Sequence, residues 1–304
     1  MNVIILDMEW NQPLELKSMR QEPFPFDSEI IEFGALKLSD DFAVVDEFKR
    51  YVRPRIYPFL SGSVARLTKI RPQSLESAPP FPEVCRDFLA WCGEPFCLCT
   101  WGPTDLRVLL DNMLIHGMET PETVLSCDLQ RVFGREIMRD NRQCSLEKAI
   151  EILGIRMDRA HDALNDARNT ARVCERMDLA ACLEEYAFRL VHYGQDRLDG
   201  LGGGRSFASP EEALADEDLK RFCCPYCGQV PEQGPWLRDP AGGFLAYHSC
   251  PEGDEFLLRL KLRRGTAGGV VAGRRIYEMS DDLWEQYQDA LEAAENRAAG
   301  SALD

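Results

Sequence analysis

Side chains suited to metal-assisted hydrolysis lie at intervals along the first two thirds of the sequence. Carboxylate oxygens are the ligands that hard divalent ions such as Mg²⁺ and Mn²⁺ prefer. Histidine changes its charge close to neutral pH, so it can accept a proton from a water molecule. The candidate residues of these types are Asp7, Glu9, Asp105, His161 and Asp166.

Asp7 and Glu9 follow a short apolar run, residues 2–6, that predicts a buried strand. Side chains two residues apart in a strand face the same side, so both carboxylates should point together. Two ionised carboxylates on one face repel each other unless a cation neutralises them. A pair of solvated acids at a strand end is the commoner explanation for such a pair alone.

Asp105 opens a segment, residues 104–116, whose apolar spacing predicts a helix after a strand at 96–101. An acid in the first turn of a helix also interacts favourably with the helix dipole. Asp105 taken alone therefore does not indicate a metal site.

His161 comes just before a helix that we predict over residues 162–177, with Asp162 as its N-cap. Asp166 would then lie one turn into this helix, near the cap. An isolated histidine and aspartate at this spacing is common. The prediction of a site depends on the ordered combination, because each candidate lies at the end of an element, where sites form in sheet proteins.

The wider pattern predicts an α/β fold. Three strands come first and helices then alternate with further strands, which indicates a mixed sheet covered by helices. The predicted strands cover residues 2–6, 30–38, 42–52 and 96–101, the predicted helices cover 61–69, 81–92, 104–116, 145–153 and 162–177, the last one running on or breaking briefly before 193, and residues 126–133 form a short helix or a strand that leads into one.

The sequence resembles the DEDDh family of 3′→5′ exonucleases over residues 1–190. Asp7-Met8-Glu9 matches the first family motif, and residues 161–169 match the third closely. Residues 100–106 are similar to the second motif in the branch that trims histone mRNA and siRNA. The resemblance implies a ribonuclease H-like fold, with a mixed five-stranded sheet flanked by helices, that hydrolyses phosphodiester bonds from a 3′ end to mononucleotides.

The same resemblance implies a role for each candidate residue. It implies two Mg²⁺ or Mn²⁺ ions, one of them held by Asp7, Glu9 and Asp166, with Asp7 bridging to the second. Asp105 is expected to act largely through water. His161 is expected to be the general base that accepts the proton of the attacking water.

Met8 and Trp10 are the expected substrate contacts, and the expected partner is the single-stranded 3′ end of a nucleic acid. Trp10 either stacks on the last base or packs in the core beside the sheet. Most relatives have a small residue in its place, and residues 60–68 keep only a trace of the usual family loop. These differences concern the choice of substrate, for which the second motif slightly favours RNA over DNA.

The net charge of −16 is unusual for an enzyme that acts on nucleic acid. Two acidic stretches, residues 211–218 and 278–304, carry most of it, so the charge does not exclude a phosphate substrate. The second stretch is expected to be a solvated helical face, with a protein partner as the alternative. No apolar run of about 18 residues predicts a membrane span, and no basic segment precedes the apolar N-terminus, so we expect a cytoplasmic protein.

A triple glycine at residues 202–204 lies in a stretch typical of a flexible linker. We therefore expect four parts along the chain. They are an exonuclease domain at 1–195, a flexible and acidic linker at 196–220, a small cysteine-bearing module at 221–279 and an acidic helical tail at 280–304.

The cysteines of the small module are spaced like zinc ligands, whereas the eight earlier ones are expected to be small buried hydrophobes. Cys224 and Cys227 belong to a Cys-Pro-Tyr-Cys turn that can direct two thiolates at one ion. His248 and Cys250 follow within the span usual between ligand pairs. We expect these four residues to hold one structural Zn²⁺ in a zinc-ribbon-like module, with Cys223 as a rival to Cys224 and a turn without metal as the alternative.

Two other functions fit parts of the pattern. A metal-dependent endonuclease could share the fold, although His161 is typical of the exonuclease branch. A catalytically dormant ribonuclease H-like protein that binds nucleic acid and carries a zinc module is the second alternative. The presence of candidate residues at all five positions argues against dormancy.

Overall fold

The computed structural model describes residues 1–139, 143–265 and 268–301, and the chain divides into two compact units. Unit 1 comprises residues 1–120 and 125–187, and unit 2 comprises residues 121–124 and those from 188 onward. The last three residues of the expected tail lie outside the described residues. Among the described helices, none has the length and apolar character needed to cross a membrane.

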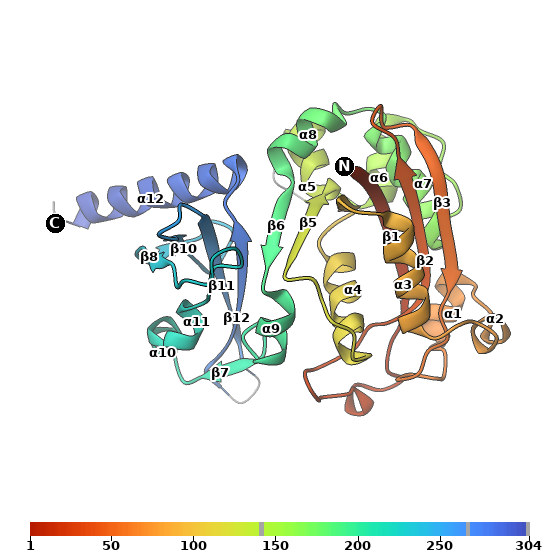
Figure 1. The fold of residues 1–304 in the computed structure, drawn as a ribbon, viewed down its shortest axis with the longest axis horizontal. Coiled ribbons are helices and arrows are strands. Elements are labelled where there is room, and N and C mark those ends of the chain that lie inside the picture. The colour runs from red at the N-terminus through yellow and green to blue at the C-terminus, as the bar shows by residue number, and fades with distance from the viewer. Residues whose placement is uncertain (140–142, 266–267, 302–304) are drawn as a thin grey trace. The chain divides into compact units, whose positions relative to one another are not determined.

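Unit 1 is built on a mixed sheet with the strand order β3-β2-β1-β4-β5 (Figure 1). The first three strands are antiparallel neighbours, whereas β4 runs parallel to both β1 and β5. This arrangement confirms the predicted mixed α/β sheet. The strands are β1 (Asn2–Asn11), β2 (Glu29–Leu38), β3 (Val44–Tyr51), β4 (Phe96–Thr100) and β5 (Thr123–Asp128).

Helices cover both faces of this sheet. On one face Phe33 of β2 contacts Phe81 and Phe88 of α3. On the other face Leu36 of β2 packs in one cluster with Ala167 of α7. The helices of unit 1 are η1 (Leu16–Ser18), α1 (Gly62–Thr68), α2 (Pro72–Glu76), α3 (Phe81–Cys92), α4 (Thr104–Ile115), α5 (Leu129–Phe133), η2 (Gly134–Met138), α6 (Leu146–Leu153), α7 (Ala163–Cys174) and α8 (Leu179–Tyr186).

Three elements differ from the sequence-based expectation or settle an open one. The first strand continues five residues beyond the predicted end at 6, because β2 pairs with it as far as Asn11. Residues 126–133 turn out to be the end of β5 followed by α5. The expectation of helix up to 193 is wrong for Phe188–Val191, which form β6, because pairing with β12 overrides local helix propensity there.

Gly34 of β2 lets α7 approach the sheet more closely than any other residue would. A Cβ atom at this position would lie 2.1 Å from the backbone carbonyl carbon of Ala163, the first residue of α7. Gly34 is also the pairing partner of Asp7 on β1. The missing side chain therefore brings the first turn of α7 next to the strand that carries Asp7.

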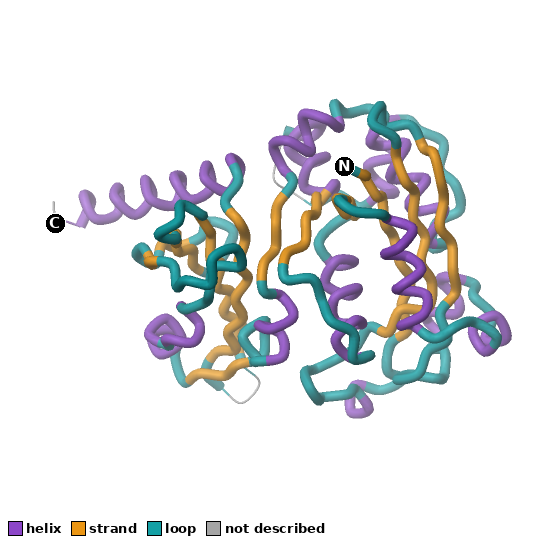
Figure 2. Tube along the Cα trace, viewed as in Figure 1, coloured by secondary structure: helices purple, strands orange, loops and turns teal. Residues whose placement is uncertain are grey.

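Unit 2 is an antiparallel sheet with the order β6-β12-β11-β10-β8, to which β7 and β9 add short pairings with β12 and β10. Figure 2 shows the long C-terminal helix α12 beside the strands of this sheet. Its Leu283, Tyr287 and Ala290 pack in one cluster with Leu237, Leu245 and Leu257 of the sheet. The acidic tail thus has an apolar side that its own unit covers. The elements are β6 (Phe188–Val191), α9 (Tyr193–Leu198), β7 (Arg205–Phe207), α10 (Pro210–Ala215), α11 (Glu217–Lys220), β8 (Glu232–Gln233), β9 (Leu237–Arg238), β10 (Phe244–Ser249), β11 (Glu255–Arg264), β12 (Val270–Glu278) and α12 (Asp281–Ser301).

The stretch at 196–220, which we expected to be a linker, contains β7, α10 and α11 in the structure. Arg274 of β12 makes a buried ion pair with Asp196, with 2.7 Å between Nη2 and Oδ1. The same guanidinium donates to the carbonyl oxygens of Asp218 and Arg221, each at 2.7 Å. These bonds attach the stretch to the sheet of unit 2.

A buried carboxylate, that of Glu29, holds the loop that follows β3. Its Oε1 accepts from the backbone N–H groups of Arg55 at 2.6 Å and Ile56 at 2.8 Å, and its Oε2 accepts from Tyr57 at 2.6 Å. Three donors that would otherwise be unsatisfied in a loop are therefore bonded to one side chain.

We predict that Glu29→Ala lowers the free energy of unfolding by about 2–4 kcal/mol, because three backbone donors lose a charged acceptor. Urea denaturation followed by circular dichroism measures this change. Glu76→Ala, at an exposed position on α2, is the control and should change stability by less than about 0.5 kcal/mol. Equal stability of the two variants would contradict the role given to Glu29.

Candidate active site

Asp7 and Glu9 lie on the part of β1 that extends past its parallel neighbour. The pairing of β1 with β4 ends at Ile5, and no described strand pairs with the backbone beyond it on that side. Instead, the backbone N–H of Met8 donates to Oδ1 of Asp105 at 3.2 Å. The same feature thus leaves this side of β1 open at the two acids and brings a third acid close to them.

Asp105 belongs to the first turn of α4 and is buried. Burial raises the pKa of its carboxyl group to about 7, against the lowering effect of the hydrogen bond from Met8. Asp105 lies in the first turn of α4, as the alternative of an interaction with the helix dipole requires, but its carboxylate also accepts a hydrogen bond from the backbone of β1. Asp105 therefore faces β1.

Asp166 and His161 are held together by the start of α7. Asp162 is the N-cap, and its Oδ1 accepts from the backbone N–H of Asn165 at 3.2 Å. Asp166 accepts from the backbone N–H of His161 at 2.7 Å through Oδ2 and from the Asn169 side chain at 3.3 Å through Oδ1. His161 has a φ of 61°, a left-handed conformation that is uncommon outside glycine and costs about 1–3 kcal/mol.

These elements bring one potential ligand atom each from Glu9, His161 and Asp166 within 4.8 Å of one another. Asp7, on the same strand as Glu9, interacts electrostatically with Asp105, Asp166 and Glu9. The five candidates from the sequence therefore lie in one place in the structure, at the joint of β1, α4 and α7.

Burial and mutual repulsion together raise the pKa values of the carboxyl groups at this site. Burial is the largest cause that raises the pKa of Asp7, and the nearby carboxylates of Asp105 and Asp166 raise it further. Burial, followed by repulsion from Asp166 and Glu32, raises the pKa of Glu9 to about 8. Negative charge gathered in this way is relieved by a cation between the carboxylates, so the donor set suits hard divalent ions.

Two residues near the site were not found from the sequence. Glu32 pairs with Glu9 across β1 and β2, and Lys49 of β3 forms ion pairs with Glu32 at 3.1 Å and with Asp162 at 2.6 Å. Lys49 thereby joins the sheet to the N-cap of α7. The strand register, which places Glu32 opposite Glu9, would have been the only signal for them.

The two expected substrate contacts differ in their surroundings. The Met8 side chain is 3 % exposed and belongs to the core, so only its backbone takes part in the site. Trp10 is half-buried, at the position after Glu9 on β1. Its indole ring therefore still has surface available for a substrate.

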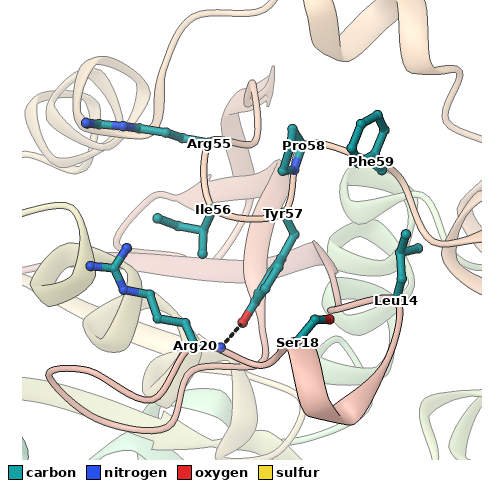
Figure 3. Close-up of a pocket in the computed structure, with 8 residues that line it drawn as sticks. All are labelled: Leu14, Ser18, Arg20, Arg55, Ile56, Tyr57, Pro58 and Phe59. Carbon is teal, nitrogen blue, oxygen red and sulfur yellow. Dashed lines mark hydrogen bonds between the residues drawn. The ribbon is translucent and has the colours of Figure 1, made fainter.

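A pocket of about 500 Å³ opens beyond the end of β1 (Figure 3). The buried side chain of Asn11, the last residue of β1, donates to the carbonyl oxygens of Tyr57 and Phe59 at 2.9 and 3.0 Å. Phe59 lines this pocket and is 74 % exposed, so its ring is accessible from solvent. The pocket is lined by Leu14, Ser18, Arg20, Arg55, Ile56, Tyr57, Pro58 and Phe59.

In unit 2 the structure assembles Cys224, Cys227 and Cys250 as expected, but it does not bring His248 to them. The ring nitrogens of His248 face the carbonyl oxygens of Ala246 and Lys220, both at 3.2 Å, and the ring packs on Phe222. The fourth member of the group is Asp254, and the ligand atoms of all four lie within 4.8 Å of one another. Cys223, the rival to Cys224, is exposed and outside the group.

Comparison with known proteins gives a consistent result. Residues 21–174 match the RNase_T family model, described as an exonuclease. The chain is 33 % identical over 205 residues to ERI1 exoribonuclease 2 of Danio rerio, covering 59 % of this chain and 35 % of that protein. It is 28 % identical over 171 residues to 3′-5′ exoribonuclease 1 of Rattus norvegicus, covering 53 % of this chain and 50 % of that protein.

A solved structure resembles part of this chain in fold as well as in sequence. It is the nuclease domain of 3′hExo, a DEDDh family member bound to rAMP, with a TM-score of 0.51 at 27 % identity. The match covers 60 % of this chain and 94 % of that domain. The chain spans half or less of the length of the two curated relatives named above.

We predict that Mg²⁺ stabilises the protein more at pH 8 than at pH 5. The carboxyl groups of Glu9 and Asp105, with pKa values raised to about 8 and about 7, are largely protonated at pH 5 and must lose protons to bind a cation. Without metal, their raised pKa values make stability fall as pH rises from their unfolded values towards 7–8. Thermal unfolding with and without millimolar Mg²⁺ at both pH values measures the difference.

The matched variants for this measurement are Asp105→Asn and Asp87→Asn. Asp105→Asn removes a buried charge, so the metal-free protein should unfold at a higher temperature at pH 8 and respond less to Mg²⁺. Asp87 is exposed on α3, and its variant should behave like the wild type. An identical response to Mg²⁺ at pH 5 and pH 8 would disprove the electrostatic description of the site.

Proposed function

Because the chain belongs to the DEDDh exonucleases of the RNase_T family, we propose that it is a 3′→5′ exonuclease that releases nucleoside monophosphates from single-stranded nucleic acid. The observation that carries the proposal is the meeting of Asp7 and Glu9 with Asp105, His161 and Asp166. The family match begins at residue 21, after β1. The geometry therefore supports the role of the first two acids independently of that match.

The carboxylates fit a pair of Mg²⁺ or Mn²⁺ ions. Their oxygens are hard ligands, and their pKa values are raised where no cation balances them. Asp7, Glu9 and Asp166 would hold one ion, Asp7 would also reach the second, and Asp105 would act through water. When bound, such a pair makes water a stronger nucleophile and stabilises the leaving oxygen.

In this proposal His161 accepts the proton of the attacking water. Its backbone N–H bonds to Asp166, so its main chain is tied to one of the proposed ligands. A ring nitrogen lies within 4.8 Å of carboxylate oxygens of Glu9 and Asp166. A neutral imidazole at this point can take the proton without adding negative charge to the crowded site.

The surroundings of β1 support a nucleic-acid strand as the substrate. The pocket beyond Asn11 has two arginines, Arg20 and Arg55, and the exposed ring of Phe59 (Figure 3). Guanidinium groups suit phosphates, and an aromatic face suits a base of any sequence. We favour RNA, since the two curated relatives are named as exoribonucleases.

For unit 2 we propose a zinc-ribbon-like module with one structural Zn²⁺. The three thiols of Cys224, Cys227 and Cys250 come from two separate turns and meet at one point. Three thiolates this close together are typical of a structural zinc site. The metal would fasten the segment before β8 to the hairpin of β10 and β11.

We predict that the protein shortens 5′-labelled RNA from its 3′ end in Mg²⁺ or Mn²⁺, and that His161→Ala slows this reaction about 10²–10⁴-fold, as loss of a general base does. A time course on RNA and DNA of equal sequence, with an EDTA lane, measures both the reaction and the preference. His192→Ala is the control, since His192 also has a left-handed backbone, with a φ of 55°, and lies in unit 2.

Two outcomes would contradict the proposed activity. The first is an unchanged rate in His161→Ala. The second is internal cleavage of a substrate whose 3′ end is blocked, which would indicate an endonuclease. Asp7→Asn completes the set and should abolish turnover while the far-ultraviolet circular dichroism spectrum is retained.

We predict that Phe59→Ala raises KM about tenfold with little change in kcat, because a lost base–aromatic contact costs about 1–3 kcal/mol of binding. Initial rates over a range of RNA concentrations separate the two constants. Val45→Ala is the control. It shortens an exposed apolar side chain of β3, away from the pocket lining, and should leave KM and kcat unchanged. Unchanged values of both KM and kcat would place Phe59 outside the substrate path.

A further inference from the structure

The cysteine group of unit 2 contains a carboxylate that the ligand pattern in the sequence does not suggest. We propose that Asp254 is the fourth ligand of the zinc ion, so that the site is Cys₃Asp. The inference rests on the zinc site proposed above and goes beyond it by naming the residue that completes the site. It concerns Cys224, Cys227, Cys250 and Asp254.

The first turn, from Cys224 to Gly228, has the geometry of a ligand-bearing turn. The backbone N–H of Gly228 donates to the carbonyl oxygen of Cys224 at 2.9 Å and closes the turn. The backbone N–H of Tyr226 points at the Sγ of Cys224, 3.4 Å away. An N–H group directed at sulfur stabilises the thiolate form, which is the form that binds metal.

The second turn, from Cys250 to Asp254, repeats these features. The backbone N–H of Gly253 donates to the carbonyl oxygen of Cys250 at 2.9 Å, and the N–H of Cys250 donates to the carbonyl oxygen of Asp254 at 2.8 Å. The backbone N–H of Glu252 points at the Sγ of Cys250, 3.5 Å away. The chain therefore contains two similar Cys-Pro turns that face one another.

The two turns differ by one residue, and this difference explains the carboxylate. In the first turn the second ligand, Cys227, comes before the left-handed Gly228, which has a φ of 75°. In the second turn the left-handed glycine, Gly253 with a φ of 99°, occupies the position equivalent to Cys227. The next residue, Asp254, then reaches back towards the first turn with its longer side chain.

The contacts of Asp254 agree with this role. Its Oδ2 lies 3.1 Å from the Sγ of Cys224, and the Sγ atoms of Cys227 and Cys250 are 3.1 Å apart. Four donor atoms thus form one compact group. Zinc accepts both sulfur and carboxylate oxygen in four-coordinate sites, and one carboxylate carries the same charge as the thiolate that it replaces.

His248, the ligand expected from the sequence, is occupied elsewhere. It is 1 % exposed, and its two ring nitrogens face backbone carbonyl oxygens. A move towards the thiols would leave the carbonyl oxygens of Ala246 and Lys220 without this partner. The ring also packs on Phe222 in the core of unit 2, which gives it a structural role.

The test uses the full chain, purified without chelator and measured for zinc by mass spectrometry. We expect one zinc per chain in the wild type, little in Cys227→Ser, and in Asp254→Asn a release to a chromogenic chelator at least about tenfold faster, since loss of a ligand weakens the site. Glu252→Gln, an exposed neighbour in the same turn, is the matched control and should release zinc at the wild-type rate.

Cobalt substitution gives a second readout that folding alone does not change. In Asp254→Cys the thiolate-to-cobalt absorption should rise by about one third over the wild type, because three sulfur ligands become four. Unchanged zinc release in Asp254→Asn together with unchanged cobalt absorption in Asp254→Cys would overturn the assignment of Asp254 alone. Absence of zinc from the wild type would overturn the zinc site as well, and the RNA assay on the same preparation would test the exonuclease separately.

Discussion

Repulsion among carboxylates that the fold holds side by side is the constraint on which the architecture of unit 1 depends. Such groups move apart unless the backbone holds them together, and when it does their pKa values rise. Here the backbone holds them together in three ways: β1 extends past β4, α4 is tied to β1 through Met8 and Asp105, and α7 is packed directly on β2. Backbone contacts therefore hold the carboxylates close together despite their mutual repulsion.

This arrangement implies that stability and function oppose each other at the site. The raised pKa values of Asp7, Glu9 and Asp105 show that the ionised state is unfavourable where no cation is present. Lys49, through its ion pairs with Glu32 and Asp162, places one positive charge beside this group of acids.

The sequence predicted those parts of the structure that depend on local order. Alternation along a strand placed Asp7 and Glu9 on one face, and capping placed Asp166 one turn into α7. It could not predict Glu32 beside Glu9, because that contact depends on strand register. Nor could it choose Asp254 over His248, because ligand type and spacing favoured the histidine, whereas the packing of β10 directs that ring at Phe222.

The contact at Gly34 shows that a residue without a reactive group determines a dimension of the site. The nearest atoms of α7 leave room for a hydrogen atom and not for a methyl group. Any larger residue there would push α7 away from the sheet. The distance between Asp166 and Asp7 would then increase, although none of the candidate ligands had been changed. In a mutational scan that measures turnover, substitutions at position 34 would therefore resemble substitutions of the catalytic residues. Gly34 has no reactive group, and its effect would come only from the distance that it sets between α7 and the sheet.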